Sequence, residues 1–263
     1  MYLRKAYCPA LVLLSMLLLS GCSGLQVLNA VTPNSGYVRH ADISYGENLR
    51  QKLDVYVPND VENSAPVVLF FYGGAWKDGN KEAYAYVAQA LTSQGYVTVI
   101  ADYRLYPEVI FPAFIKDGAN AVAWVHNNIA DYGGNPQQVF IMGHSAGAHI
   151  AATLVLDESY LQAHGGSNNW FAGFIGLSGP YDFELTSDLL RGVFGPPADY
   201  PETQPINFVD GGNPPTLLMH GKDDERVHTL DTKLLTQKIR AAGGPVTMKL
   251  YEDTGHIWMI ASL

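Results

Sequence analysis

The stretch QVFIMGHSAGAHIAATLVL, residues 138–156, decides how the 263-residue chain folds. It opens with an apolar run of strand length and closes with an apolar run of helix length. Between the two runs, Ser145 stands between Gly143 and Gly147, so the chain can turn tightly without side chains striking the neighbouring backbone. The stretch therefore predicts a buried strand, a sharp turn with a serine at its tip, and a helix.

Further strands and helices alternate on both sides of this stretch. The predicted strands are KLDVYV (52–57), PVVLFFY (66–72), YVTVIA (96–101), FAGFIGLSG (171–179), PTLLMHG (215–221) and VTMKLY (246–251), and the predicted helices span 82–95, 113–134 and 229–244. Such alternation is typical of a mostly parallel sheet with helices on both faces. It predicts one α/β domain over residues 37–263, with a small cap or surface excursion at residues 180–213.

The turn at Ser145 fits the pattern G-x-S-x-G in its required setting, after a strand and before a helix. A serine hydroxyl is a weak nucleophile unless a base accepts its proton. With this motif the acid and then the histidine follow the serine along the chain. Among eight histidines, His256 is the predicted base because it lies in the loop after the last predicted strand. His144, inside the motif, is expected to point away from Ser145.

The acid of the triad is expected in the turn HGKDDERV, residues 220–227. We prefer Asp224, with Asp223 as the alternative. Its role would be to hold one tautomer of His256 and to stabilise the imidazolium. His220 ends the preceding strand, and we expect it to orient the loop that carries the acid.

A hole for a developing negative charge is expected after the strand 66–72, where the sequence reads YGGAW. The predicted donors are the N–H groups of Gly74, Ala75 and Ala146. Apolar substrate contacts could come from aromatic side chains near the site. The candidates are Trp76 and Tyr181, followed by Phe183 and Trp258.

The N-terminus is expected to lie outside the domain. MYLRK is followed by ALVLLSMLLLS (10–20), which is too short to span a bilayer. LSGC (19–22) resembles the bacterial lipoprotein signal, which implies a signal peptide over 1–21, acyl chains on Cys22 and a tether over 22–36. Ser23 after the cysteine then favours the outer membrane, facing the periplasm. An ordinary secretory signal is the alternative. The other cysteine, Cys8, lies within the signal, so no disulfide is expected.

Net charge and missing motifs argue against several classes of function. The net charge of −9 argues against nucleic acid as a partner, because phosphate binding needs a basic face. No dinucleotide-binding or phosphate-loop motif is present. No histidine or cysteine spacing suggests a metal, since His144 and His149 are five positions apart and do not share a helix face.

Taken together, the motifs resemble the esterase/lipase branch of the α/β-hydrolase superfamily. The resemblance runs from about Asp42 to His256 through YGENLRQKLDVYVP, FFYGGAW, DYRLYPE, GHSAGAHIAA, LSGPYDF and HGKDDERV. The sequence is most similar to bacterial carboxylesterases related to feruloyl esterase-like proteins and isoprenylcysteine methylesterases. The resemblance implies a serine hydrolase that cleaves carboxylic esters without a cofactor, and the small cap favours small esters.

Two departures from the family pattern stand out. Tyr72 occupies the place of the usual histidine before the glycines, and IWMIASL (257–263) looks like a C-terminal helix cut short. Two other functions stay open at this point. One is an amidase or peptidase of the same fold, and the other is a non-catalytic, lipid-anchored binding protein.

Overall fold

The structure, a computed structural model, describes residues 24–61 and 64–263. The predicted signal peptide and the predicted lipidation site, Cys22, lie outside these residues. Among the described residues, no helix is both long enough and apolar enough to cross a membrane.

The described residues form an eight-stranded sheet in the order β1-β2-β4-β3-β5-β6-β7-β8. The β1–β2 and β2–β4 pairs are antiparallel and the remaining pairs are parallel. The strands are β1 Tyr37–Ser44, β2 Lys52–Pro58, β3 Ala65–Phe71, β4 Val97–Ala101, β5 Gly134–His144, β6 Gly173–Leu177, β7 Thr216–Gly221 and β8 Val246–Tyr251. The predicted α/β fold with a mostly parallel sheet is confirmed.

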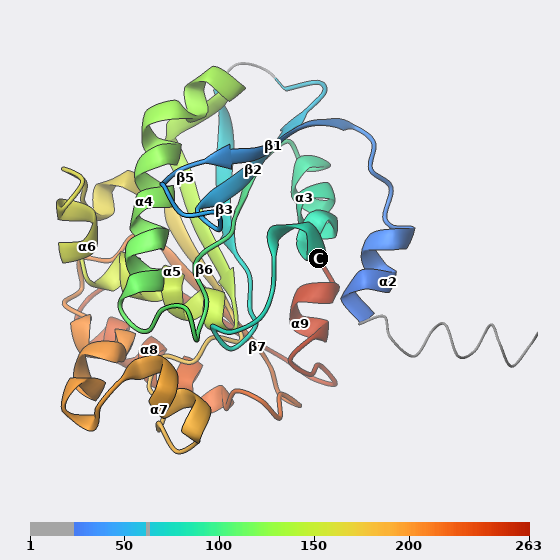
Figure 1. The fold of residues 1–263 in the computed structure, drawn as a ribbon. Coiled ribbons are helices and arrows are strands. Elements are labelled where there is room, and N and C mark those ends of the chain that lie inside the picture. Colours follow the sequence, from blue (N-terminus) through green and yellow to red (C-terminus); the bar gives the residue numbers. More distant parts are fainter. Residues whose placement is uncertain (1–23, 62–63) are drawn as a thin grey trace, which may run out of the picture.

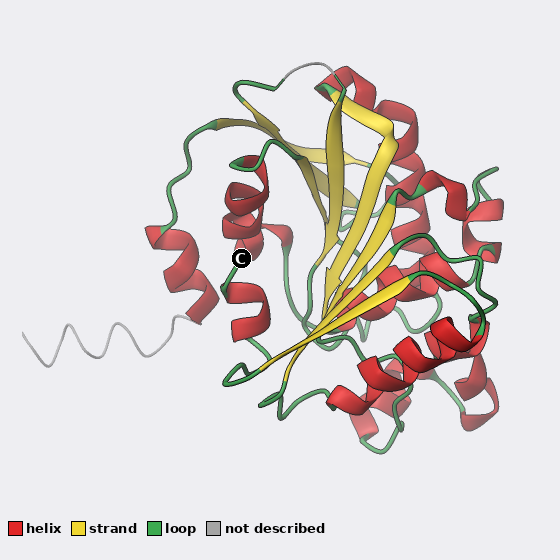
Figure 2. Ribbon diagram, turned by 180° about the vertical axis from the view of Figure 1, so that it is seen from behind, coloured by secondary structure: helices red, strands yellow, loops and turns green. Residues whose placement is uncertain are grey.

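Helices cover both faces of the sheet, as Figures 1 and 2 show. The α-helices are α2 Gly24–Val31, α3 Ala85–Thr92, α4 Ala113–Asn128, α5 Ala146–Leu156, α6 Ser159–Gln162, α7 Asp188–Phe194, α8 Thr229–Ala241 and α9 Trp258–Ala261. Short 3-10 turns complete them: η1 Lys81–Tyr84, η2 Ile129–Tyr132, η3 Asn168–Trp170, η4 Pro197–Thr203 and η5 Pro205–Phe208. Helices α3 and α9 lie on one face, and α4, α5 and α8 lie on the other.

Burial explains why the central strands read as continuous apolar runs. Every residue of β4 is buried, and β3 is buried at all but one position. Both faces of these strands are covered, so neither face needs polar side chains.

Strand order places a crevice at the carboxyl ends of β3 and β5. The chain leaves β3 toward β4 on one side, and β5 pairs with β3 on the other side. In open α/β sheets, ligands bind outside the carboxyl ends of the strands at such a reversal. The loop after β3 and the turn with Ser145 therefore meet at the position where a site is expected.

Two segments differ from the sequence prediction. Strand β1 was not predicted, because most of its side chains are exposed and it carries no apolar run. The predicted tether contains helix α2, which is attached to the domain: Asn29 Nδ2 donates to the Glu82 carbonyl at 2.7 Å, and the Tyr86 N–H donates to Asn29 Oδ1 at 3.0 Å. Leu28 also packs against the core.

Candidate active site

Ser145 lies at the junction of β5 and α5 in a strained conformation, with φ 55° and ψ −123°. Its N–H donates to the Leu177 carbonyl at 2.9 Å, which ties the turn to β6. A Cβ on Gly143 would lie 2.3 Å from the Gly147 carbonyl oxygen, and one on Gly147 would lie 2.0 Å from that of Phe71. Only glycine fits at either position, so the motif follows from backbone packing as well as from chemistry.

His256 and Asp224 form a buried hydrogen-bonded pair, with 2.7 Å between His256 Nδ1 and Asp224 Oδ2. Because a carboxylate only accepts, Nδ1 carries the proton and Nε2 keeps its lone pair. Ser145 and His256 line the same cavity. In the described chain, no hydrogen bond joins the Ser145 hydroxyl to the His256 ring.

The Asp224 carboxylate accepts three hydrogen bonds and lies close to a fourth polar group. Its Oδ1 accepts from the N–H groups of Arg226 and Val227, each at 2.9 Å, while Oδ2 accepts from His256 and lies 3.2 Å from His220 Nε2. Burial raises the pKa of this carboxyl, but the hydrogen bonds from His220, His256 and Val227 outweigh burial and lower it below its usual range. The group is therefore an anion at neutral pH.

His220 orients the acid loop, as the sequence predicts. Its Nε2 lies 3.0 Å from the Val227 carbonyl and 3.2 Å from Asp224, so this nitrogen must carry the proton. Nδ1 then accepts from the Thr232 hydroxyl at 2.7 Å. The ring thus connects β7 and α8 to the loop that holds the acid.

His144 does not point away from the site, contrary to the prediction. Its ring is buried beside that of His256, with 4.7 Å between ring centroids, and it lines the cavity. Its Nε2 lies 3.0 Å from the His256 carbonyl oxygen and donates to it, while the buried Nδ1 has no partner within the part of the chain that the structure describes. Burial lowers the pKa of His144 to about 3, so the ring is neutral. His144 thereby attaches the loop of His256 to the Ser145 turn.

The loop after β3, residues 73–80, faces Ser145, and we call it the oxyanion loop. A Cβ on Gly73 would lie 2.8 Å from Ser145 Cβ, so this glycine permits the close approach. The N–H groups of Gly74, Ala75 and Ala146 donate to no other atom in the described part of the chain. Ala146 is also the first residue of α5, where the helix dipole favours negative charge. These three groups can stabilise an oxyanion on a substrate bound to Ser145.

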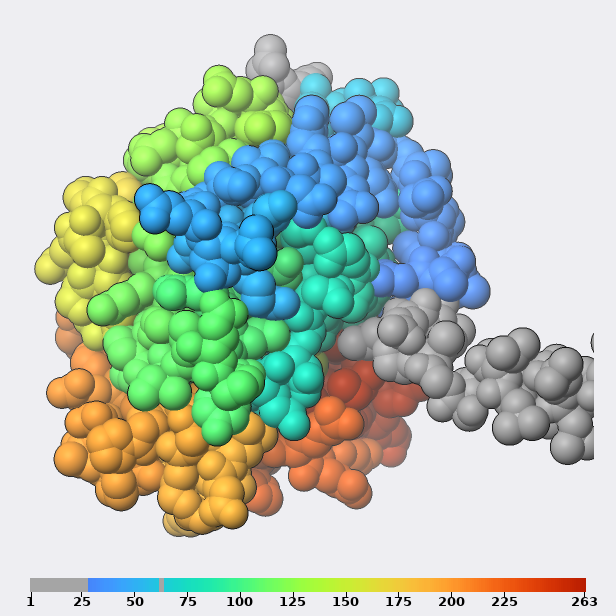
Figure 3. Space-filling view, in the orientation of Figure 1, coloured from blue at the N-terminus to red at the C-terminus, as the bar shows by residue number. Residues whose placement is uncertain are grey.

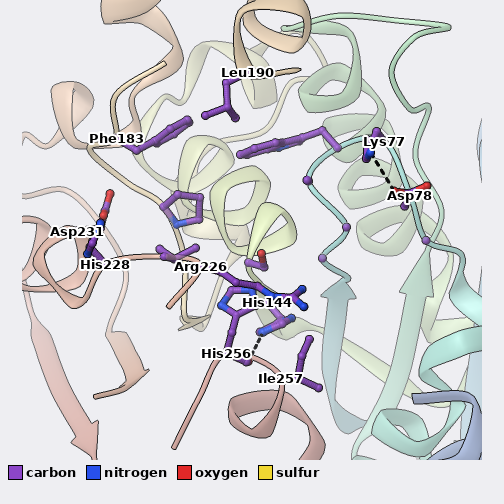
Figure 4. A pocket seen from close by; sticks show the side chains of 18 of the residues that line it. Lys77, Asp78, His144, Phe183, Leu190, Arg226, His228, Asp231, His256 and Ile257 are labelled. Carbon is purple, nitrogen blue, oxygen red and sulfur yellow. Dashed lines mark hydrogen bonds and ion pairs between the residues drawn. The ribbon is translucent and has the colours of Figure 1, made fainter. Parts of the chain in front are cut away.

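The cavity above these residues has a volume of about 1260 Å³. Figure 4 shows Phe183 and Leu190 at one end, and His256 and Ile257 at the other. Trp76, a predicted substrate contact, lines the cavity, and its ring stacks on that of Phe183 with 5.8 Å between centroids.

Two aromatic candidates do not reach this cavity. Tyr181 is a correction to the sequence prediction: its side chain is fully buried and does not line the cavity, and its N–H donates to Asp231 Oδ1. Trp258 is 69% exposed and also lies off the cavity wall. Beside Tyr181 the cavity is lined by Pro180, Asp182 and Phe183, and beside Trp258 it is lined by Ile257.

The insertion supplies one side of the cavity. Figure 3 shows this segment, in orange, packed beside the green segment around residue 110. The Phe111 N–H donates to the Val193 carbonyl at 2.8 Å, and His149 Nε2 on α5 donates to the Thr203 carbonyl at 2.8 Å. The insertion is therefore attached both to α5 and to the loop around Phe111. Within residues 24–61 and 64–263, no group of His, Cys, Asp and Glu is arranged to hold a metal ion.

Fold and site geometry together define an α/β hydrolase. A family model described as BD-FAE matches residues 53–239, and the chain belongs to this family. It is 31% identical over 236 residues to isoprenylcysteine alpha-carbonyl methylesterase ICME of Arabidopsis thaliana, an alignment that covers 81% of this chain and 55% of that protein. It is also 31% identical over 225 residues to esterase LipC of Mycobacterium tuberculosis, covering 78% and 56%.

Solved structures share the fold. A truncated carbohydrate esterase from gut microbiota superposes with a TM-score of 0.77 at 22% identity, covering 88% of this chain and 93% of that one. Esterase B of Lactobacillus rhamnosis, inhibited by a tributyrin phosphonate, superposes with a TM-score of 0.80 at 20% identity. The superposition covers 96% of this chain and 88% of that one. The chain spans about half the length of the curated relatives it matches.

Proposed function

We propose that this chain is a serine hydrolase that cleaves carboxylic esters through a covalent acyl-enzyme. One observation carries the proposal: Ser145, His256 and the unpartnered N–H groups of the oxyanion loop border a single cavity. The named activities of the similar proteins, a methylesterase and an esterase, support an ester as the substrate.

The reaction begins with an ester carbonyl over Ser145. His256 Nε2 takes the serine proton as the hydroxyl attacks, and the carbonyl oxygen becomes an oxyanion facing Gly74, Ala75 and Ala146. Asp224 stabilises the imidazolium. His256 then gives the proton to the leaving alcohol oxygen, which leaves the acyl group on Ser145. Water, deprotonated by His256, attacks this acyl group and releases the carboxylic acid.

Steady-state hydrolysis of p-nitrophenyl acetate and butyrate tests the proposal. We expect Ser145→Ala to lower kcat by at least about 10³-fold. Ser262→Ala, which changes a serine near the C-terminus, is the matched control and should retain the wild-type rate. Equal rates for wild type and Ser145→Ala would exclude a serine mechanism.

The two other functions are separated by the same assay. A matched panel of p-nitrophenyl esters and p-nitroanilides distinguishes an esterase from an amidase or peptidase, and we expect the esters to be cleaved preferentially. A wild-type protein inert toward the whole panel would favour the binding protein.

We also propose that Cys22 is lipidated and anchors the domain to the outer membrane, facing the periplasm. The support is the sequence LSGC at residues 19–22. Several acyl chains on one cysteine suffice for stable anchoring. Metabolic labelling with an alkyne fatty acid in bacterial cells should mark the wild type and leave Cys22→Ala unmarked, whereas equal labelling of both would contradict the anchor.

A further inference from the structure

Tyr72 immediately precedes the oxyanion loop and is fully buried. Its hydroxyl donates to Asp102 Oδ1 at 2.6 Å and accepts from Arg50 Nη2 at 2.8 Å. The Tyr103 hydroxyl donates to the Tyr72 carbonyl at 2.8 Å. We call Arg50, Tyr72, Asp102 and Tyr103 the Tyr72 cluster. None of the four side chains lines the cavity, so the cluster does not touch a substrate there.

The Tyr72 cluster also holds the far end of the oxyanion loop. Arg50 Nη2 donates to the Gly79 carbonyl at 2.9 Å, and Asp102 Oδ1 accepts from the Lys81 N–H at 2.9 Å. A Cβ on Gly79 would lie only 2.7 Å from Cε2 of Tyr72, so the tyrosine ring fills the space behind the loop. The same cluster thus contacts the loop at its beginning and at its end.

The oxyanion loop needs such support because its backbone is strained. Gly74, Ala75 and Trp76 have φ values of 139°, 51° and 57°. Such conformations persist only where the surroundings impose them. Within the loop, the N–H groups of Lys77 and Asp78 donate to the Gly74 carbonyl at 3.1 and 3.0 Å. From outside the loop, the Tyr106 N–H donates to the Trp76 carbonyl at 2.9 Å, and the Tyr72 cluster holds the two ends of the loop.

A phenol suits this position because it donates one hydrogen bond and accepts another. Burial raises the pKa of Tyr72 well above its usual value, so the hydroxyl keeps its proton. Phenylalanine would fill the same space and could neither donate to Asp102 nor accept from Arg50. The hydroxyl is therefore the atom that distinguishes support of the loop from simple packing.

We propose that Tyr72 is a positioning residue that, through Arg50 and Asp102, directs the Gly74 and Ala75 N–H groups toward the oxyanion. The inference rests on the proposed function, because the oxyanion forms only if Ser145 attacks a carbonyl. Its structural half, the support of the loop, can be measured without turnover.

The test compares wild type with Tyr72→Phe, and Tyr86→Phe is the control. Tyr86 is a buried tyrosine in the same row of aromatic rings, 6.1 Å from Tyr84 between centroids, and its hydroxyl has no hydrogen-bond partner among the described residues. Kinetics are normalised to the amount of serine that a fluorophosphonate titrates. Amide hydrogen exchange of residues 73–80 and affinity for a trifluoromethyl ketone are measured on the same samples.

We expect Tyr72→Phe to lower kcat by about 10- to 100-fold, since donors to the oxyanion act mainly in the transition state. KM should stay within about threefold of the wild-type value. Ketone affinity should fall in parallel with kcat/KM, and exchange of the loop amides should quicken. Tyr86→Phe should change none of these quantities.

The inference would be overturned if Tyr72→Phe changed neither kcat nor the exchange of the loop amides. It would also be overturned if the lower rate came entirely from a smaller amount of titratable serine, with an unchanged rate per titrated serine. If Tyr72→Phe does not fold, Arg50→Gln replaces it, because this variant removes the guanidinium that donates to both the Tyr72 hydroxyl and the Gly79 carbonyl, and the same changes in kcat and amide exchange are expected. A wild type without hydrolase activity would overturn the proposed function instead, and the exchange measurement would then decide the role of the Tyr72 cluster alone.

Discussion

Asp224 shows how one side chain can organise a site. Two backbone N–H groups hold its Oδ1, while the rings of His256 and His220 contact Oδ2. Its geometry is thereby independent of the exposed acidic residues beside it. A fixed anion at this position selects the Nδ1–H tautomer of His256, and in the proposed mechanism the lone pair on Nε2 accepts the serine proton.

Asp224→Asn should therefore lower kcat by about 10³- to 10⁴-fold, because the amide can stabilise the wrong tautomer of His256 and cannot balance an imidazolium. The matched control is Asp223→Asn, which changes the adjacent exposed carboxylate. Hydrolysis of p-nitrophenyl butyrate at pH 7.5 measures both. If Asp223→Asn lowered kcat strongly and Asp224→Asn kept a kcat near that of the wild type, Asp223 would be the acid in place of Asp224.

At the scale of elements, the insertion over residues 180–213 shapes one end of the cavity. Phe183 stacks on Trp76, and Phe194 meets Trp76 edge to face with 4.7 Å between ring centroids. In the proposed mechanism His256 protonates the leaving alcohol, so we expect the alcohol at the end of the cavity near His256. We then expect the acyl group to point toward Phe183 and Leu190, at the opposite end of the cavity in Figure 4.

Shortening the side chain at this end should change the preferred acyl length. We expect Phe183→Ala to raise kcat/KM for p-nitrophenyl octanoate relative to acetate by about 10-fold, since each extra methylene that finds room adds apolar contact. Leu49→Ala, at a residue that is 87% exposed and off the cavity, is the control. The ratio of the two kcat/KM values is the measurement, and an unchanged ratio in Phe183→Ala would place the acyl group elsewhere.

Sequence reasoning succeeds for elements whose signal is local. The glycines around Ser145 and the apolar runs of β3, β4 and β5 can be recognised in the sequence, because close backbone contact and burial on both faces restrict the residue types there. Strand β1 escapes prediction because its side chains are mostly exposed, and α2 escapes because its contacts are with η1 and α3, far along the chain.

Contacts between distant segments explain the remaining differences in the site. His144 meets the His256 carbonyl across 112 positions of sequence, and the motif says nothing about that contact. Tyr181 and Phe183 are two positions apart in one aromatic segment, and only the path of the insertion determines that Phe183 reaches the cavity. Residue type predicts the chemistry here, while tertiary packing decides which of several similar residues performs it.

For the whole molecule, two buried neutral histidines make stability depend on pH. Burial lowers the pKa of His144 to about 3 and that of His149 to about 4, against about 6.5 in an unfolded chain. Below pH 6.5 the unfolded chain binds protons that the folded chain does not. The free energy of unfolding is therefore highest above about pH 7 and falls as the pH drops toward 4, by up to about 1.4 kcal/mol per pH unit for each histidine.

His149→Phe isolates half of this effect. The His149 ring packs among Trp76, Phe183 and Phe194, and a phenylalanine ring can occupy the same place without titrating. Urea unfolding at pH 5, 6 and 7 should show a smaller loss of stability per pH unit than in wild type, by up to about 1.4 kcal/mol. His164→Gln, at an exposed loop position, should keep the wild-type slope. Identical slopes in wild type and His149→Phe would contradict a buried neutral His149.

The central claim is that the hydroxyl of Ser145 is activated as a nucleophile by His256 and Asp224. The most direct measurement is intact-protein and peptide mass spectrometry after brief exposure to a fluorophosphonate. We predict one adduct per chain, located on Ser145, that forms at least about 10³-fold more slowly in His256→Ala. An unmodified wild-type protein, or an adduct on any other residue, would contradict the account.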